Sequence, residues 1–354
     1  MKPIEFYQAH LDAVSRSFAL CIPQLSPPFR EQVALSYLLF RVLDTVEDAS
    51  FSDQRIQARQ FETFRRFLRE RPPREEIDRF REAFPPSLSD GERALLADAE
   101  ALIDDAHELP APVRAVILSG LDRMAQGMAL YAMRPSPLRL LDLEDVNRYC
   151  CFVAGIVGEL LTRLWALGGG DPPSLLQAYR FGLFLQKVNI LKDQAEDEEA
   201  GRFFVPDRRE LLASLRSDAE GALSYLVPLP RSERGYRTFC AWSLMLGAAS
   251  LAAMDGGARF ARVASREGAQ AAATNDPRES RRAQTLALFG RTAELIEDDA
   301  ALRQQFADLM PELPGPVARA PLKKPESETR VLRRVLAALG PHELTALGAM
   351  TTGQ

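Results

Sequence analysis

The sequence has few residues that bind metals through nitrogen or sulfur. Its 354 residues include only three histidines, which share no motif, and four cysteines. Cys150 and Cys151 are adjacent, no cysteine belongs to a Cys-x-x-Cys pair, and Cys21 and Cys240 also lie in apolar, helix-forming sequence. We therefore expect buried free thiols in a reducing compartment and no histidine-based metal site.

Strong charge and long apolar runs are also missing. The formal net charge is −5 and no basic face accumulates along the chain, which argues against a nucleic-acid-binding protein. No apolar run follows the opening MKPIEFYQAH, and charged residues or glycines interrupt the other apolar runs before about 20 residues. We expect a cytoplasmic protein without a signal peptide or transmembrane anchor, which could still contact a membrane peripherally to release an apolar product.

The sequence does contain helical periodicity along most of its length. Alternation typical of half-buried strands is nearly absent, so we predict an all-α fold. Breaks such as QLSPPF and GGGDPPS separate the helices. The predicted helices cover roughly 4–20, 28–49, 53–70, 74–84, 89–108, 111–132, 142–168, 173–198, 207–216, 218–227, 231–257 and 277–309. We expect residues 1–309 to form one large helical domain, followed by a proline-rich strap and a short terminal helix, 328–339, within the tail 310–354.

Three acidic residues share one face of a predicted helix that is otherwise apolar. In VLDTVEDAS, Asp44 and Asp48 lie one helical turn apart and Glu47 lies on the adjacent ridge. Arg41 and Tyr37 continue the same face towards the N-terminus. Alone, such a cluster is typical of the end of an amphipathic helix.

A second polar stripe lies on another predicted helix, in FLQKVNILKDQAEDEEAGR. Asn189, Asp193 and Asp197 recur every four residues, with Gln186 one turn earlier and Glu196 beside the last aspartate. Oxygen ligands at this spacing can converge on Mg²⁺, which also bridges to substrate phosphates. A solvated acidic face explains the end of this stretch but not Asn189 and Asp193 in apolar sequence. We therefore predict two acidic helices that face each other across a metal–diphosphate site.

Cations that could bind a diphosphate accompany both motifs. They are Arg16, Arg41, Lys192 and Arg202. Arginine offers a two-pronged contact to phosphate, whereas lysine offers a point charge. The alternative for each is a surface ion pair, which fits Arg41 poorly because its helix is apolar.

A third stretch, RYCCFVAGIVGELLTRLW, carries small residues on one helix face. Ala154 and Gly158 lie one turn apart, which allows either close helix packing or room along the wall of a cavity for a long apolar ligand. Tyr149 could present its hydroxyl at a polar mouth. Apolar residues that could line such a tunnel, or form plain core, are Phe18, Phe152, Leu161, Phe181, Leu183 and Phe239.

These motifs resemble those of the squalene/phytoene synthase family. SRSFALCIPQL, YLLFRVLDTVED, RMAQGM, YCCFVAGIVG and LQKVNILKDQAEDEEAGRFFVP follow the family's order over roughly residues 10–270. The first, second, fourth and fifth contain residues discussed above. FCA at 239–241 and FLQKxNI are more similar to the squalene synthase branch than to the phytoene synthase branch.

The resemblance implies an isoprenoid (terpenoid) synthase fold around a central cavity. It also implies a prenyltransferase that joins two farnesyl diphosphates head to head, with two or three Mg²⁺ ions, through presqualene diphosphate to squalene. NADPH would supply the final hydride. An alternative within the family needs no NADPH and makes presqualene diphosphate, dehydrosqualene, phytoene or another terpene. A non-catalytic assembly factor of the same fold is a third reading.

The resemblance also assigns roles to residues of this chain. The implied metal ligands are Asp44, Glu47, Asp48, Asn189, Asp193, Glu196 and Asp197. The implied diphosphate ligands are Arg16, Arg41, Lys192 and Arg202, and the residues implied to act on the reacting groups are Tyr37, Tyr149 and Arg41. The implied substrate pocket contains Ser15, Ser17, Phe18, Val153, Ala154, Val157, Gly158, Leu161, Leu183, Gln186 and Phe239.

The sequence departs from the family's pattern where NADPH would bind. The loop ASFSDQRIQARQ lacks paired lysines, and the basic stretch near VASREG is reduced to Arg266, which is the one candidate cofactor residue. A nucleotide's phosphates need positive charge to bind, so whether NADPH delivers a hydride stays open. We expect the first half-reaction, which forms presqualene diphosphate, to be unaffected.

Overall fold

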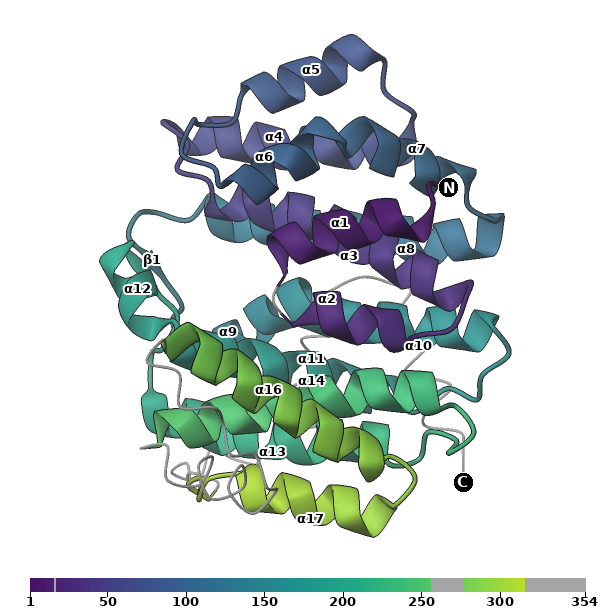
Figure 1. Cartoon of the computed structure of the whole chain (residues 1–354). Coiled ribbons are helices and arrows are strands. Elements are labelled where there is room, and N and C mark those ends of the chain that lie inside the picture. Colours follow the sequence, from purple (N-terminus) through teal and green to yellow (C-terminus); the bar gives the residue numbers. More distant parts are fainter. Residues whose placement is uncertain (16, 256–276, 316–354) are drawn as a thin grey trace, which may run out of the picture.

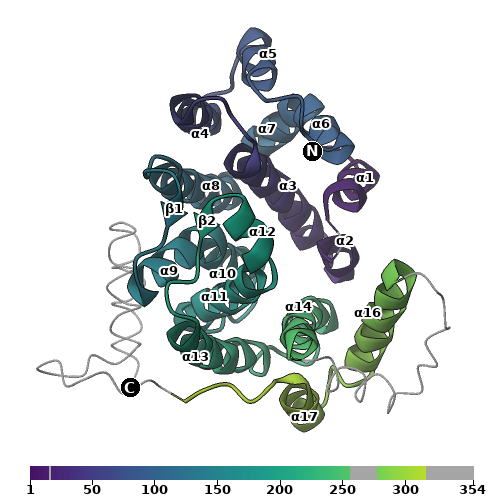
Figure 2. The same cartoon turned by 90° about the vertical axis from the view of Figure 1, so that its left-hand side faces the viewer.

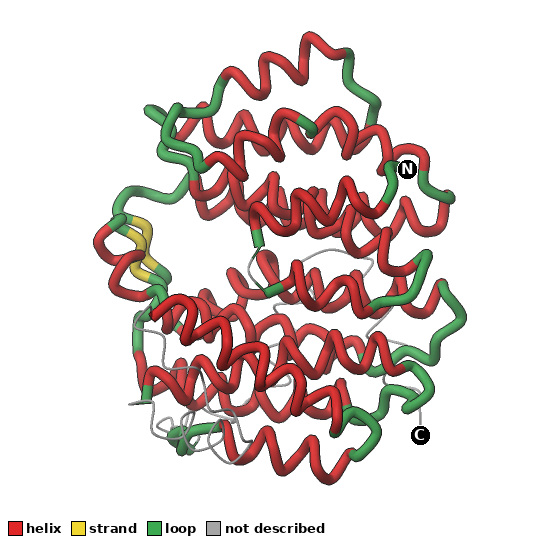
Figure 3. The backbone as a smooth tube through the Cα atoms, in the orientation of Figure 1, coloured by secondary structure: helices red, strands yellow, loops and turns green. Residues whose placement is uncertain are grey.

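The computed structural model describes residues 1–15, 17–255 and 277–315, and in these residues it is almost entirely helical (Figures 1 and 3). The N-terminal elements are α1 (Ile4–Val14), α2 (Phe18–Cys21), η1 (Ile22–Gln24), α3 (Phe29–Asp48), α4 (Gln54–Arg69), α5 (Arg74–Glu82), α6 (Asp90–Ala97), α7 (Ala99–Glu108) and α8 (Ala111–Ala132). The remaining elements are β1 (Leu138–Arg139), α9 (Leu143–Cys150), η2 (Cys151–Gly155), α10 (Ile156–Leu167), α11 (Leu175–Lys192), α12 (Gln194–Glu199), β2 (Arg202–Phe203), α13 (Arg208–Leu226), α14 (Arg234–Met254), α16 (Pro277–Glu294) and α17 (Asp299–Leu309). The predicted all-α class is confirmed.

Several helices begin where the sequence offers a capping side chain. Asp53, Asp142 and Asp207 each accept a hydrogen bond from a backbone N–H in the first turn of α4, α9 and α13. Ser89 and Glu92 form a complete capping box at the start of α6. These local signals explain why the predicted starts of these helices lie within a few residues of the observed ones.

Some predicted helices were divided or joined wrongly. The predicted 4–20 helix ends at Val14 and is followed by α2, 89–108 contains two helices, and 277–309 contains α16 and α17. Conversely, 207–216 and 218–227 form the single helix α13. The terminal helix predicted at 328–339 lies outside the described residues.

The helix α11 lies at the centre of the fold, with α10, α13 and α14 packed around it (Figure 2). It is buried on nearly every side, which explains its weak amphipathicity. The helix α3 packs on α1, α8 and α10 in the other half of the molecule. Together α2, α3, α10, α11 and α14 enclose the central space.

The segment η2 is a π-helical turn between α9 and α10. The sequence analysis predicted one continuous α-helix here. Immediately after η2, the chain approaches α11 very closely, because a Cβ atom at Gly158 would collide with the carbonyl oxygen of Ala178. A Cβ atom at Gly182 would likewise collide with the carbonyl of Ala154. Close packing is therefore one reason for the small residues of this stretch.

Two short strands were not predicted at all. Leu138 pairs with Arg202 and Arg139 with Phe203, in parallel, so β1 and β2 join the loop after α8 to the segment after α12. The Arg139 guanidinium lies 3.7 Å from the centre of the Phe203 ring. This pairing fixes the backbone of Arg202, which matters for the site below.

All four cysteines are buried and free, as expected. Within the described part of the chain, one helical stretch, Leu143–Leu167, is long and apolar enough to cross a membrane by length and composition. Half of its most apolar window is buried inside the fold. A core helix of a soluble protein passes the same test, so this stretch is weak evidence of a membrane span.

Candidate functional site

Two adjoining cavities form the candidate site. An apolar cavity of about 300 Å³ lies between α3, α10, α11 and α14, and a polar cavity of about 730 Å³ lies at the C-terminal ends of α3 and α11. Asp44, Val153, Gln186 and Asn189 line both cavities. Both volumes lie near the range of about 300–1,000 Å³ that is usual for small-molecule sites. The arrangement suits a ligand with a charged head and an apolar tail.

The last turns of α3 present three carboxylates to the polar cavity, namely Asp44, Glu47 and Asp48. Burial raises the pKa of Asp44 to about 7, and repulsion by Asp48 adds to this rise. The attraction of Arg41 lowers the pKa but is the weaker effect. Burial and the two neighbouring aspartates raise the pKa of Glu47 to about 8, and burial also raises the pKa of Asp48. These carboxylates lack sufficient positive charge around them, which is typical of a site that binds cations.

The second acidic motif lines the facing wall of the same cavity. Asn189, Asp193, Glu196 and Asp197 all contribute to it. The helix is not continuous here, because Asp193 leaves helical geometry between α11 and α12. The backbone hydrogen bonds from Asp193 to Asn189 and from Asp197 to Asp193 are kept, so the four-residue spacing still brings the side chains to one side. The sequence prediction that both motifs face each other across a cavity is confirmed in this respect.

The Arg202 side chain connects the two acidic walls. Its guanidinium lies 2.9 Å from Asp197 Oδ1 and 3.8 Å from Asp48 Oδ1. A positive group therefore occupies the space between the motifs. In the described residues, no three carboxylate, histidine or cysteine groups already converge on one point. The donors are carboxylate and amide oxygens, which fit Mg²⁺, and a guanidinium stands where added positive charge is favourable.

The other predicted diphosphate ligands are placed differently. Arg41 lines the polar cavity and pairs with Glu92 of α6 at 3.1 Å, and its Nη1 lies 3.7 Å from Asp44 Oδ2. Its Nε is buried without a hydrogen-bond partner. Lys192 lies at the rim, half exposed, and pairs with Asp193 at 3.2 Å. Arg16 lies outside the described residues.

Tyr149 lies at the boundary between the acids and the apolar wall. Its hydroxyl donates to Glu47 Oε1 at 3.3 Å, and its ring stacks on Phe204 at 5.0 Å and meets Tyr131 edge-on. Burial and the nearby Glu47 raise its pKa well above the usual value, so it is a protonated donor at neutral pH. Tyr37 instead lines the apolar cavity, where burial raises its pKa despite a hydrogen bond with Ser15.

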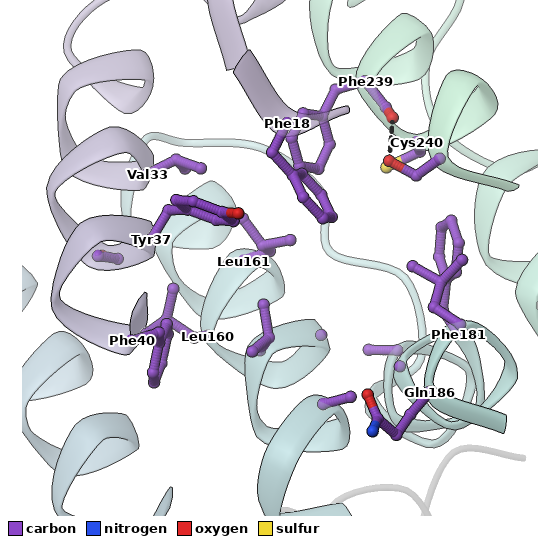
Figure 4. A pocket seen from close by; sticks show the side chains of 18 of the residues that line it. Phe18, Val33, Tyr37, Phe40, Leu160, Leu161, Phe181, Gln186, Phe239 and Cys240 are labelled. Carbon is purple, nitrogen blue, oxygen red and sulfur yellow. Dashed lines mark hydrogen bonds between the residues drawn. The ribbon is translucent and has the colours of Figure 1, made fainter. Parts of the chain in front are cut away.

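Most of the predicted pocket residues do line the apolar cavity. They are Phe18, Val153, Ala154, Val157, Gly158, Leu161, Phe181, Gln186 and Phe239. Figure 4 shows Val33, Tyr37 and Phe40 along one wall, with Phe181 and Gln186 on the facing wall.

Other predicted lining residues lie elsewhere. Leu183 is buried behind the wall, where its side chain is close to Gly155, and the Phe152 ring covers Gly127. Ser15 and Ser17 belong to neither cavity; Ser15 Oγ accepts a hydrogen bond from the backbone N–H of Phe18. Arg266 lies outside the described residues.

The structure adds residues that the sequence analysis missed. Arg134 lines the polar cavity and forms a two-pronged ion pair with Asp145, with distances of 2.5 and 2.7 Å. Asp145 also accepts from the hydroxyl of Tyr131, whose ring supports Tyr149. Burial raises the Asp145 pKa, but hydrogen bonds from Arg134 and the Leu141 backbone N–H outweigh it and hold the pKa below its usual value.

No periodic pattern marks these residues. Their only sequence signal is the arginine in MRPSPLR followed by acids in LEDV.

The all-α architecture of this chain is the isoprenoid synthase fold. Two solved structures share it: TcSQS in complex with the ligand BPH1237 (TM-score 0.65, 22% identity, 99% of each chain covered) and TcSQS in complex with E5700 (TM-score 0.62, 24% identity, covering 87% of this chain and 97% of that one). Residues 11–264 match the family model of squalene/phytoene synthase, and the chain belongs to that family.

Curated squalene synthases are among the similar proteins. The chain is 33% identical to the squalene synthase of Schizosaccharomyces pombe over 280 residues, which are 69% of this chain and 58% of that protein. It is 35% identical to the squalene synthase of Saccharomyces cerevisiae over 203 residues, 55% of this chain and 44% of that protein. The matched region thus spans about half the length of these relatives.

Proposed function

We propose that the protein is a Mg²⁺-dependent prenyltransferase of the squalene synthase type, which joins two farnesyl diphosphates head to head through presqualene diphosphate to squalene. The observation that carries this proposal is the junction of the two cavities. Asp44, Gln186 and Asn189 face both a polar space lined by two acidic motifs and an apolar space suited to an isoprenoid chain. The similarity to curated squalene synthases supports the same substrate class.

In this proposal the two acidic walls hold the metal ions. Asp44, Glu47 and Asp48 on one side, and Asn189, Asp193, Glu196 and Asp197 on the other, would hold two or three Mg²⁺ ions, which stabilise the departing diphosphate. Arg202 already lies between these walls, and Arg41 has an unpaired buried Nε in the same cavity. Both arginines can therefore contact the phosphate oxygens, while Lys192 adds a point charge at the rim.

The apolar cavity would shelter the allylic cation that remains. Phe18, Tyr37 and Phe239 form a contiguous aromatic group on its wall, with ring centres 5.2 and 6.1 Å apart. Their faces exclude water and favour positive charge. Tyr149 holds a proton beside Glu47 at the boundary, which places it to steer the proton lost when the cyclopropane ring forms.

A product assay tests the proposal. The purified chain is incubated with farnesyl diphosphate and Mg²⁺, with and without NADPH, and both the diphosphate products and the extracted hydrocarbons are identified by mass spectrometry. We expect presqualene diphosphate without NADPH and squalene with it. If the same products form with and without NADPH, the protein instead catalyses the NADPH-independent reaction, which yields presqualene diphosphate, dehydrosqualene, phytoene or another terpene.

Variants separate catalysis from a purely structural role. Asp48→Ala and Asp193→Ala remove one carboxylate from each wall, and we expect each to abolish product formation without unfolding the protein. Asp12→Asn changes an exposed acid on α1 that lines neither cavity, and serves as the control. Wild-type protein that makes no product from any prenyl diphosphate would favour an assembly factor of the same fold. We further propose that residues 1–309 are the catalytic unit and that the product leaves by peripheral contact with a membrane.

A further inference from the structure

The apolar cavity has a defined end, opposite the acids. Val33 lies about three turns before Asp44 on α3, and Ala178 lies about three turns before Asn189 on α11. Both helices therefore give a depth of about 16 Å from the acidic end to the far end. Both helices run in the same sense along the cavity, so Val33 and Ala178 mark the same end.

A chain of hydroxyl groups closes this end. Thr162 Oγ1 donates to the carbonyl oxygen of Gly158 at 2.8 Å and lies 2.8 Å from Tyr225 Oη, which in turn lies 2.5 Å from Tyr236 Oη. The Thr162 hydroxyl has a single proton and donates it to Gly158. Tyr225 must therefore donate to Thr162, and Tyr236 to Tyr225. None of these three hydroxyl groups has a proton left to donate to a ligand.

The hydroxyl chain is also rigidly supported. Thr162, Tyr225 and Tyr236 are only 1–2% exposed, and both tyrosines line the cavity. The Tyr236 ring packs against Trp165 and Phe29 with centre distances of 4.8 and 5.3 Å. Three helices, α10, α13 and α14, are thus joined across the end of the cavity. A stop built this way cannot yield by a simple rotamer change, because each hydroxyl would lose a buried hydrogen bond.

We propose that the Tyr236–Tyr225–Thr162 hydroxyl chain is the stop that sets the prenyl chain length accepted by this protein. The inference rests on the proposed function, because the ligand is taken to be a prenyl diphosphate whose head lies in the polar cavity. An extended carbon chain advances about 1.25 Å per bond, so the 12-carbon main chain of a C15 prenyl group spans about 14 Å and the 16-carbon main chain of a C20 group about 19 Å. A depth of about 16 Å accepts the first and excludes the second.

The test measures binding of chain-length analogues apart from turnover. Thiolodiphosphate analogues of the C10, C15 and C20 prenyl groups, which do not ionise readily, are titrated by calorimetry in the presence of Mg²⁺. We expect the wild type to prefer C15 over C20 by at least tenfold. Tyr225→Ala and Tyr236→Ala should reduce that preference at least tenfold by deepening the cavity.

Conservative and opposing variants make the result specific. Tyr225→Phe keeps the ring and should shift the preference by less than the alanine change does. Val33→Phe fills the same end, and should weaken C15 binding about tenfold while leaving C10 binding unchanged; it covers the case in which an alanine variant fails to fold. Tyr7→Phe is the matched control, since it removes a buried tyrosine hydroxyl that donates to Asp105 outside both cavities.

Failure of the proposed stop can be distinguished from failure of the proposed function. A wild type that binds C15 and C20 equally, or a folded alanine variant and Val33→Phe that both leave the preference unchanged, would overturn the stop and leave the proposed function standing. A wild type that binds no prenyl analogue at any length would overturn the proposed function, and the stop with it.

Discussion

The crowded carboxylates of the polar cavity should make the stability of the protein depend on pH and on Mg²⁺, which can be tested without substrate. Without metal, Asp44, Glu47 and Asp48 repel one another in a site that is partly shielded from water, and their pKa values are raised. The metal-free protein should therefore lose stability as pH rises, and added Mg²⁺ should restore it. The measurement is thermal unfolding of the metal-stripped chain between pH 6 and pH 9, with and without Mg²⁺.

The direction of this change in folding stability with pH follows from the pKa values of the carboxylates. In the unfolded chain Asp44 and Glu47 titrate near 3.8 and 4.5, whereas in the folded chain they titrate near 7 and 8. Groups whose pKa is raised by folding contribute stability that is complete below about pH 4 and is lost as pH rises through about 7–8. Each change of one in pKa is worth about 1.4 kcal/mol. The Asp44 side chain is 38% exposed and screened by water, so we expect a total loss of only about 1–2 kcal/mol.

These energies convert into measurable shifts. For a chain of this length a loss of about 1–2 kcal/mol lowers the Tm by about 1–3 °C. Mg²⁺ at a hundred times its Kd adds about 2.7 kcal/mol, or about 4 °C. The gain should be larger at pH 8 than at pH 6, because protons compete with Mg²⁺ for the same carboxylates.

An isosteric variant provides the decisive comparison. Asp44→Asn removes one of the repelling charges, so it should raise the Tm of the metal-free protein at pH 8 and at the same time abolish most of the response to Mg²⁺. Asp12→Asn should change neither. A metal-free Asp44→Asn protein that melts below the wild type at pH 8, or a Mg²⁺ response that is the same in both, would refute the reasoning.

Three further predictions concern the packing around the site. Lys187→Met leaves the buried Asp218 carboxylate without the ammonium that it pairs with and should cost about 3–5 kcal/mol in urea unfolding; adding Asp218→Leu should recover most of the loss, and a double variant as unstable as the single one would contradict this. Gly158→Ala forces a methyl group against the Ala178 carbonyl and should cost about 1–3 kcal/mol, so an unchanged Tm would show that α10 and α11 can separate freely. Tyr149→Phe keeps the ring but removes the proton beside Glu47, so kcat for the first half-reaction should fall about 100-fold or more while stability changes by about 1 kcal/mol; a normal kcat would exclude Tyr149 from proton transfer.

The parts of the site that follow from short-range spacing could be predicted from the sequence. Asp44 and Asp48 share a face because a helix repeats every 3.6 residues, and the same holds for Asn189 and its partners. Apolar neighbours on the other faces made it clear that these polar stripes point inwards. The facing of the two motifs was predicted from their shared ligand chemistry, since nothing in the spacing places one helix opposite another.

The parts that depend on contacts between distant segments could not be predicted. Arg41 is held by Glu92, 51 positions away in the chain, and Arg202 is fixed by pairing of β2 with β1, which is too short to leave an alternating pattern. Leu183 is not among the residues that line the apolar cavity, for a different reason. Because α11 is buried on nearly every side, hydrophobicity does not reveal which face lines the cavity. Leu183 lies three residues before Gln186, so its spacing does not exclude it from the cavity face, and only the observed contact of its side chain with Gly155 shows where it packs.

The Arg202 bridge has a consequence for the order of events in the life of the protein. Metal-dependent folds whose ligands carry no internal counter-charge must wait for their ion before they can form. Here a side chain of the protein itself spans the two acidic walls, at 2.9 and 3.8 Å, so we expect the cavity to fold without metal and to bind the proposed Mg²⁺ ions afterwards. At low Mg²⁺ concentration we would then expect a folded but inactive protein, instead of an unfolded protein that proteases can cleave.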